Sequence, residues 1–246
     1  MANMTSHIHC QNCSMAALCL PYQLDQDGMA RLDTIIQRHK PIHKRDVLVN
    51  AGESLKCFYA VRSGSLKSYT LDDNGVEQII DFHLPGDVIG FDALANSQHR
   101  SYTQALETAM LCEIPMSSLD ELAEQMPGLR RQMWRLMSGE IYSSKQLLGT
   151  LNNRSAQQRL ANFLTTLADR FKERGLSNRS FRLTMTRADI GNYLGLSVET
   201  ISRILSALQA EGVIDVQNKL VNVLEPERLR ELAQGSTTLA LREPMH

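Results

Sequence analysis

Residues 186–203 read TRADIGNYLGLSVETISR and contain the clearest structural signals of the chain. Thr186 and Asp189 have the spacing of a capping box, in which each side chain bonds to the backbone of the other residue at a helix start. Gly195 then allows a tight turn, and Ser197 is placed to cap a second helix. Two short helices joined by a glycine-containing turn are typical of a helix-turn-helix.

The second helix, expected from Val198 to about Gln209, has one apolar and one polar face. Glu199, Ser202 and Arg203 share the polar face. In a major groove Arg203 could donate to guanine O6 and N7, while Glu199 could accept from cytosine N4. By itself this face could also be a solvated surface with a Glu–Arg pair. The predicted DNA-binding residues are Arg187, Ser197, Glu199, Thr200, Ser202 and Arg203.

A β-hairpin is expected directly after the second helix. Apolar runs at 212–217 and 220–224 flank Asn218-Lys219. A hairpin in this position is the wing of a winged helix, and it favours DNA binding over the solvated-surface alternative. Basic side chains that could contact phosphates, and so position the protein without reading sequence, are Arg179, Arg182, Arg187 and Lys219.

Residues 41–115 have the pattern of short strands separated by turns. One turn is Asn74-Gly75, which we expect to be a type I′ hairpin turn because both residues tolerate positive φ. Several short strands at this spacing predict a small antiparallel barrel or jelly roll. A short helix is expected before them, from Asp25 to about His39.

The longest helix is expected from about Leu129 to Leu151. Within it, residues at alternating spacings of four and three form a heptad seam, which in a helix between two domains usually packs against a second copy of itself. Packing on the barrel is the alternative. The polar Ser144 should weaken pairing. The predicted dimer seam is Met137, Ile141, Ser144, Leu148 and Leu151.

Three of the five cysteines, Cys10, Cys13 and Cys19, lie within ten residues, and Cys112 ends a strand run far downstream. Cys57 lies in an apolar strand pattern and is expected to be structural. Four thiolates suit either zinc or an iron–sulfur cluster, and spacing alone leaves both open. His7 and His9 could join a zinc site.

Composition adds limits rather than a function. The chain has 246 residues and a net charge of −1, so any basic surface must be local. No apolar run approaches the roughly 20 residues that span a bilayer, and no secretory signal is visible, so we expect a cytoplasmic protein with no membrane partner. Neither a nucleophile elbow nor a phosphate-binding glycine loop occurs, which argues against an enzyme.

Over residues 25 to about 235 the chain resembles the bacterial cyclic-AMP receptor protein superfamily, and within it the fumarate and nitrate reduction regulators. The segments that carry the likeness are 9–14 with Cys19, 59–64, 104–108, 112–115, 136–141 and 181–203.

The resemblance implies an α+β fold with four parts. These are a cluster-binding segment (1–24), an antiparallel β-roll similar to cyclic-nucleotide-binding domains (25–128), a dimerisation helix (129–152) and a winged helix-turn-helix (153–246).

The resemblance also implies a mechanism. Cys10, Cys13, Cys19 and Cys112 match the ligands of a 4Fe-4S cluster, and Cys57 matches none. In the family the intact cluster favours a homodimer that binds palindromic operator DNA with TTGAT half-sites. Oxygen converts the cluster to a 2Fe-2S form, the dimer loosens and DNA is released. Glu199, Ser202 and Arg203 match the base-reading residues, and contact with RNA polymerase is implied.

Two departures from the family pattern alter these expectations. Relatives commonly have an acidic residue where this chain has Ser144, and its repulsion keeps the cluster-free protein monomeric. We therefore expect a more persistent cluster-free dimer here. At Gly75-Val76 the chain lacks an acidic residue of a surface that contacts the polymerase.

A cyclic-nucleotide sensor is the main rival within the superfamily. Arg100-Ser101 is similar to the phosphate-binding pair of the superfamily's nucleotide pocket. However, Phe91 stands about where a carboxylate would hold the ribose. We expect no binding of cyclic AMP.

Overall fold

A computed structural model describes residues 9–38 and 40–235, which divide into two units. The first unit comprises the described residues up to Leu71, together with Ile80–Ile141. The second comprises Asp72–Ile79 and the described residues from Tyr142 onward. His7 and His39, on which parts of the sequence predictions fall, lie outside the described residues, as do both ends of the chain.

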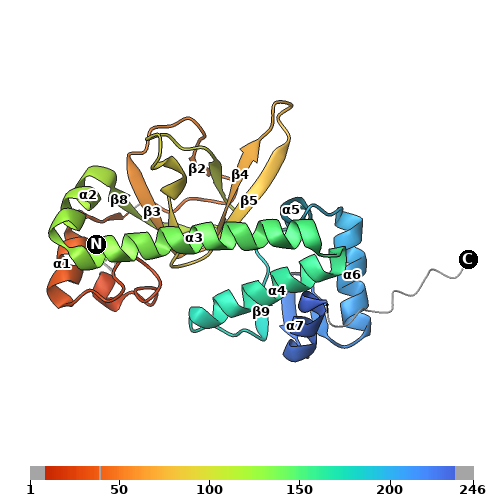
Figure 1. Cartoon of the computed structure of the whole chain (residues 1–246). Coiled ribbons are helices and arrows are strands. Elements are labelled where there is room, and N and C mark those ends of the chain that lie inside the picture. The colour runs from red at the N-terminus through yellow and green to blue at the C-terminus, as the bar shows by residue number, and fades with distance from the viewer. Residues whose placement is uncertain (1–8, 39, 236–246) are drawn as a thin grey trace, which may run out of the picture. The chain divides into compact units, whose positions relative to one another are not determined.

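Two antiparallel four-stranded sheets in residues 37–38 and 40–115 form a β-roll, which belongs to the first unit except for the turn and the start of a strand at Asp72–Ile79 (Figure 1). One sheet has the order β1 (Gln37–Arg38), β8 (Met110–Pro115), β3 (Cys57–Ser63) and β6 (Val88–Ile89). The other has the order β2 (Val47–Val49), β7 (Tyr102–Ala105), β4 (Leu66–Leu71) and β5 (Glu77–His83). The predicted antiparallel roll is confirmed.

Strand alternation explains the core of this unit. In β3 Phe58 and Ala60 are buried at 0% and 4% exposure, and Phe58 pairs with Ile114 of β8, which is also fully buried. Successive side chains of a strand point to opposite faces, so these residues share the inner face. Leu119 and Leu129, which lie in the two helices that follow the last strand of the roll, belong to the same apolar cluster.

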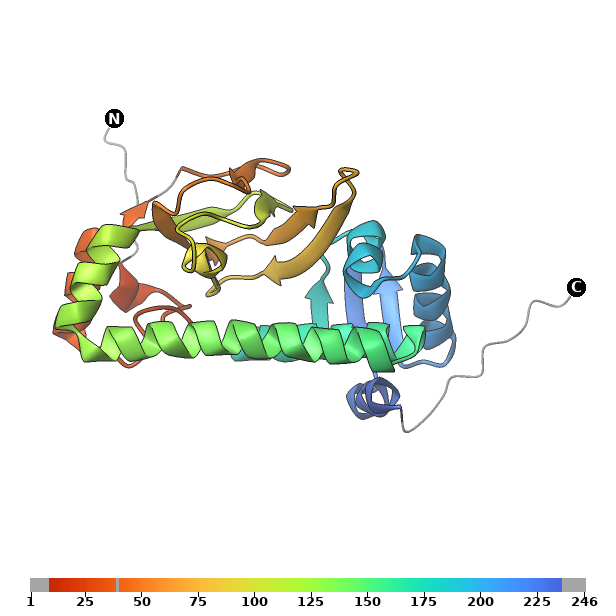
Figure 2. The same ribbon diagram turned by 45° about the horizontal axis from the view of Figure 1, so that its top comes forward.

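Three helices accompany the roll: α1 (Gln26–Ile35), α2 (Met116–Gln125) and α3 (Pro127–Asn153), the last passing into the second unit after Ile141. Figure 2 shows α1 and α2 at one end of the roll, with the N-terminal turns beside them. Asp25 caps α1 by accepting from Gly28 N at 2.8 Å. Within 9–38 and 40–235, no helix is long and apolar enough to cross a membrane.

The prediction that the first helix extends to about His39 is wrong. Helix α1 ends at Ile35, and Ile36 is extended, with φ −78° and ψ 123°. Gln37 and Arg38 pair with Glu113 and Cys112 of β8. Pairing with the distant strand β8 therefore overrides the helical spacing of the apolar residues. Ile35 and Ile36, which are β-branched, have little intrinsic preference for a helix.

The predicted type I′ turn between β4 and β5 is also wrong. Gly75 has a φ of 77°, but Asn74 is not among the described residues with positive φ. Gly75 N donates to Asp72 O at 2.9 Å. The Asp72 carboxylate accepts from the backbone N of Asn74 at 2.9 Å and of Val76 at 2.8 Å. The aspartate side chain thus stabilises a wider turn, with glycine at its last position.

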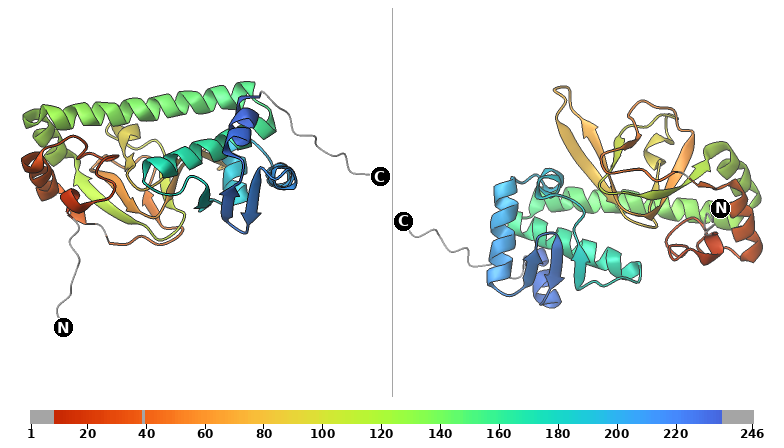
Figure 3. Two further views of the ribbon diagram at one scale, coloured as in Figure 1. Left: turned by 90° about the horizontal axis from the view of Figure 1, so that it is seen from below. Right: turned by 180° about the vertical axis from the view of Figure 1, so that it is seen from behind.

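The second unit is a winged helix-turn-helix (Figure 3). Its helices are α4 (Ala156–Glu173), α5 (Arg187–Leu194), α6 (Val198–Ala210) and α7 (Pro226–Gln234). Its sheet has the order β10 (Ile214–Gln217), β11 (Leu220–Val223) and β9 (Ser180–Arg182). The predicted helix pair, its caps and the following hairpin are confirmed.

Candidate DNA interface and cysteine site

Two helix caps and one glycine define where α5 and α6 begin and how the chain turns between them. Thr186 and Asp189 form the predicted capping box, with Asp189 N donating to Thr186 Oγ1 at 3.0 Å and Thr186 N donating to Asp189 Oδ2 at 2.8 Å. Gly195 ends α5 in the left-handed conformation (φ 63°, ψ 42°). Ser197 caps α6 by accepting from Thr200 N at 3.2 Å.

Gly191 is required by a close approach of the turn. A Cβ atom at this position would lie 2.5 Å from the carbonyl oxygen of Leu196, which is backbone and cannot move aside. We expect Gly191→Ala to lower the free energy of unfolding of the DNA-binding unit by about 2 kcal/mol or more, as overpacking does. Urea unfolding followed by circular dichroism measures this.

Gly139→Ala is the matched control, because a Cβ at this helical glycine meets nothing within 4 Å. That substitution should stabilise α3 by roughly 0.5–1 kcal/mol. Equal effects of the two substitutions would contradict the account of the turn.

The polar face of α6 is open. Ile201, Ile204, Leu205 and Leu208 are buried against the rest of the unit, whereas Glu199 and Arg203 are exposed and Ser202 is half-buried. The described part of the chain contains no Glu199–Arg203 ion pair; Arg203 instead donates to Thr200 Oγ1 at 3.4 Å. The pKa of Glu199 is lowered by its own backbone N–H and by Ser197. This face offers an ionised acceptor beside a guanidinium donor.

The basic residues predicted to contact phosphates are partly engaged. Arg187 reaches from α5 to α6 and donates to Ser202 Oγ at 2.9 Å. Lys219, in the turn of the wing, donates to Thr184 O at 3.1 Å. Arg182 lies opposite Leu220 in the sheet, and both Arg179 and Arg182 are exposed. The two side-chain bonds orient Arg187 and Lys219.

The cysteine segment packs against the main apolar cluster of the first unit, to which it belongs. After a 3-10 turn, η1 (Cys10–Asn12), the chain continues in turns, with Cys19 N donating to Met15 O at 3.1 Å. Leu20 is 1% exposed and belongs to the main apolar cluster, against which Cys19 and Cys112 also pack. The packing of Leu20 in this cluster therefore helps to order the segment.

The four cysteines singled out by the sequence lie within electrostatic range of one another. Burial and then neighbouring charges, including that of Cys112, raise the pKa of Cys10 to about 12. The pKa of Cys19 is raised by burial, with contributions from the other three thiols. That of Cys112 is raised by burial and partly offset by Arg38.

Cys57 stands apart from this group. Its thiol donates to Glu113 Oε1 at 3.2 Å, and its pKa is raised to about 11 by burial and by that carboxylate. Cys57 is not among the groups that shift the pKa values of Cys10, Cys19 and Cys112.

Asp33 and Arg38 beside the cysteines were not found from the sequence. Asp33 accepts from Cys10 N at 3.2 Å and from Arg38 at 2.8 Å, and it bonds to His9 Nδ1. Burial opposes the ionised carboxylate, but these bonds lower its pKa to about 2. No local pattern links Asp33 to Cys10, because the contact spans 23 residues.

The four thiols suit a metal centre bound by sulfur, although their side chains are not yet in coordinating positions. In 9–38 and 40–235, no three His, Cys, Asp or Glu side chains are already arranged to hold a metal ion. The four thiols nevertheless come from one ordered segment and one adjoining strand, and buried thiols with raised pKa values need a cation to become thiolates. Thiolate-only coordination suits iron–sulfur clusters and zinc.

The predicted seam on α3 is partly a row of exposed apolar side chains. Ile141 is 55% and Leu148 is 59% exposed, while Met137 and Leu151 are half-buried. Trp134, 60% exposed, continues the seam three residues before Met137 and was missed from the sequence, although the same periodicity reaches it. Such a row on one helix face favours an interface.

Comparisons with known proteins agree with this architecture. The cyclic nucleotide-binding domain family matches residues 39–126, and the Crp-like helix-turn-helix domain family matches residues 158–232. The structure of FixK2 from Bradyrhizobium japonicum, 28% identical, covers 80% of this chain and 97% of its own length, with a TM-score of 0.72.

Closely similar sequences are regulators. The anaerobic regulatory protein of Aggregatibacter actinomycetemcomitans is 54% identical, over 92% of this chain and 88% of its own length. The fumarate and nitrate reduction regulatory protein of Escherichia coli K12 is 50% identical, over 95% of this chain and 93% of its own. The prediction of a DNA-binding transcription regulator rather than an enzyme is confirmed. The chain belongs to the family of anaerobic, or fumarate and nitrate reduction, regulatory proteins.

Proposed function

We propose that this protein is an oxygen-responsive transcription regulator. Cys10, Cys13, Cys19 and Cys112 would hold a 4Fe-4S cluster, and the homodimer would bind palindromic operator DNA in the cytoplasm and contact RNA polymerase. The observation that carries the proposal is the approach of these four thiols, and not Cys57, to one another. The names of the relatives, anaerobic and fumarate and nitrate reduction regulatory proteins, supply the condition to which it responds.

The cluster would supply one piece of chemistry, its conversion by oxygen to a 2Fe-2S form. The chain supplies the coupling to α3. Gln132 of α3, 4% exposed, donates to the carbonyl oxygen of Cys19 at 2.9 Å. Leu20 packs in the same cluster as Leu129, in the first turn of α3. An ordered cysteine segment therefore supports the start of the helix that carries the apolar seam.

In the bound dimer, α6 would lie in the major groove. Glu199, Ser202 and Arg203 would read base edges, while Ser197, Thr200 and Arg187 would position the helix. Arg179, Arg182 and Lys219 would contact phosphates. Arg187 would also fix the Ser202 hydroxyl through the bond between them.

Anaerobic and air-exposed protein would bind DNA differently, and this tests the proposal. A palindromic duplex with TTGAT half-sites is titrated with protein purified without oxygen and again after exposure to air, at one salt concentration. We expect weaker binding after exposure. Equal affinity in both states would contradict oxygen response.

The seam predicts how strongly the dimer depends on the cluster. Ser144 is exposed on α3, and in a paired seam it would face its copy. We expect Ser144→Asp to raise the dimer dissociation constant of the cluster-free protein by about tenfold or more, because two carboxylates would meet. Sedimentation equilibrium measures this constant.

Ser143→Asp is the matched control, because Ser143 is also exposed but lies outside the seam. It should leave the dimer intact. The prediction would be wrong if the cluster-free wild-type protein were entirely monomeric. It would also be wrong if Ser144→Asp and Ser143→Asp had the same dimer dissociation constant. Air exposure should also release DNA more completely from Ser144→Asp than from the wild type.

A further inference from the structure

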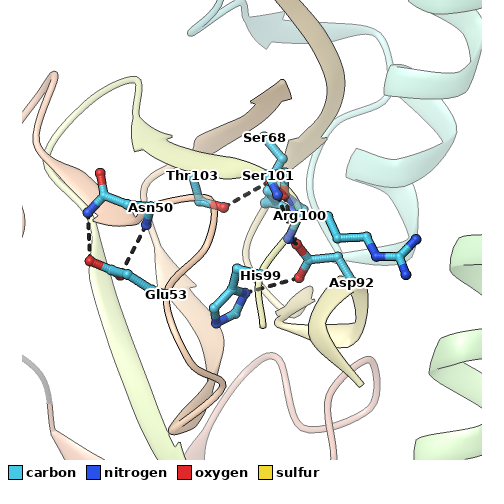
Figure 4. Close-up of polar contacts among 9 residues, drawn as sticks. Asn50, Glu53, Ser68, Asp92, His99, Arg100, Ser101 and Thr103 are labelled. Atoms are coloured by element: carbon cyan, nitrogen blue, oxygen red, sulfur yellow. Dashed lines mark hydrogen bonds and ion pairs between the residues drawn. The ribbon is translucent and has the colours of Figure 1, made fainter. Parts of the chain in front are cut away.

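Asp92 of the β-roll is half-buried, and its carboxylate contacts the three consecutive residues His99, Arg100 and Ser101 (Figure 4). It belongs to the short 3-10 turn η2 (Phe91–Ala93). Its Oδ2 accepts from Arg100 N at 2.9 Å, Ser101 N at 3.2 Å and Ser101 Oγ at 3.0 Å. Its Oδ1 is 3.1 Å from Nδ1 of His99. In Figure 4 the guanidinium of Arg100 points away from this carboxylate.

The donors are held in place by a framework that does not involve Asp92. Gly52 N donates to His99 O at 2.8 Å, and His99 N donates to Glu53 O at 2.9 Å. The supporting loop is closed by Asn50, whose N and Nδ2 donate to the Glu53 carboxylate at 3.1 and 2.9 Å. His99 and Ser101 are 6% and 5% exposed. Two adjacent backbone N–H groups with a hydroxyl form a preorganised anion site.

We propose that the donors of His99, Arg100 and Ser101 form an oxyanion-binding cradle that the chain fills with its own Asp92 carboxylate. The ligand class of this cradle is a small oxyanion, a carboxylate or a phosphate group, because charge-assisted bonds from N–H and O–H donors suit both. While Asp92 is in place, the β-roll is closed to the phosphate of an external cyclic nucleotide, although its sequence matches the cyclic nucleotide-binding domain family.

The surroundings of the cradle also disfavour a nucleotide. The ring of Phe91 packs against Phe58, with centroids 5.3 Å apart, so an apolar side chain stands beside the cradle. On α3, burial and then the charges of Asp81, Asp92 and Asp87 raise the pKa of Glu140 to about 7. A cyclic nucleotide that bound while Asp92 stayed in place would bring a second negative charge next to these carboxyl groups, and the added repulsion would disfavour it.

Chemical rescue tests the cradle. Full-length Asp92→Ala, purified without oxygen, is heated in sodium formate and in sodium chloride at equal concentration, and unfolding of the β-roll is followed. In chloride its melting temperature should fall by roughly 3–10 °C, because the donors of the buried residues His99 and Ser101 lose their acceptor. Formate should restore a large part of that loss by binding the vacated cradle. The wild type should melt at the same temperature in both salts.

Three controls make the outcome specific. Asp73→Ala removes an exposed carboxylate of the β4–β5 turn and should change neither value. Asp92→Ala combined with Ser101→Ala should respond less to formate, because one donor is gone. If Asp92→Ala does not fold, Ser101→Ala alone decides. It should lower the melting temperature without any formate response, and an unchanged melting temperature would overturn the cradle.

Calorimetric titration of the wild type with cyclic AMP tests closure. We expect no binding. Stoichiometric binding of cyclic AMP would overturn the proposal, as would an Asp92→Ala protein that melts like the wild type or responds equally to both salts.

Discussion

Replacing Cys112 by serine is expected to weaken cluster binding at least about tenfold and to lower the iron that each chain retains through purification, since even the loss of a residue that only supports a ligand costs 10–100-fold in metal affinity. Cys112 lies in β8, far in sequence from the other three cysteines, and is electrostatically coupled to them. Serine is close in size and keeps a polar atom, so the strand should form as before. The measurement is iron and sulfide content after anaerobic purification.

Cys57→Ser is the matched control, because Cys57 lies on the neighbouring strand β3, where Cys57 pairs with Pro115. Its thiol donates to Glu113, and a serine hydroxyl can make the same bond. Iron content should stay at the wild-type level. The ligand assignment would be wrong if Cys57→Ser lost the iron and Cys112→Ser kept it.

Replacing Arg203 by alanine is expected to weaken binding to the TTGAT operator by about 5- to 150-fold, corresponding to roughly 1–3 kcal/mol for a bidentate contact with guanine. The guanidinium is exposed in the first half of α6, where it donates a weak hydrogen bond to Thr200 Oγ1 and interacts electrostatically with Glu199. Fluorescence anisotropy at constant salt gives the affinity.

If Arg203 reads a base, its removal should abolish the ability of the protein to distinguish the operator from a duplex with that base changed. Wild-type protein should bind worse when the half-site guanine is changed, whereas Arg203→Ala should bind both duplexes alike. Lys172→Ala, which removes an exposed cation from α4 and leaves α6 and the wing untouched, is the charge-matched control and should behave like the wild type. If Arg203→Ala still distinguished the two duplexes, Arg203 would not read that base.

The winged helix could be predicted from the sequence because its signals are local. Thr186 and Asp189 are three residues apart, Ser197 bonds to Thr200, and Gly195 alone supplies the left-handed turn. Each of these contacts stays within one helical turn. The exposed face of α6 could be predicted because the apolar residues that are buried recur at helical spacing and leave the polar residues on the other side.

The features that the sequence did not predict depend on contacts far apart in the chain. The end of α1 is set by the pairing of Arg38 with Cys112, and Asp33 reaches Cys10 across 23 residues. The Asp72 side chain, rather than Asn74-Gly75 alone, determines the β4–β5 turn. Arg100-Ser101 suggested a phosphate site, but only the fold brings Asp92 into it.

Metal content and the absorption spectrum of protein purified without oxygen distinguish an iron–sulfur cluster from zinc at the four cysteines. We expect a straw-brown protein with about four iron and four sulfide per chain, as a 4Fe-4S cluster requires. Its visible absorption should change on exposure to air. A colourless protein that contains one zinc per chain, with a spectrum insensitive to air, would show that the four cysteines do not hold an oxygen-labile cluster.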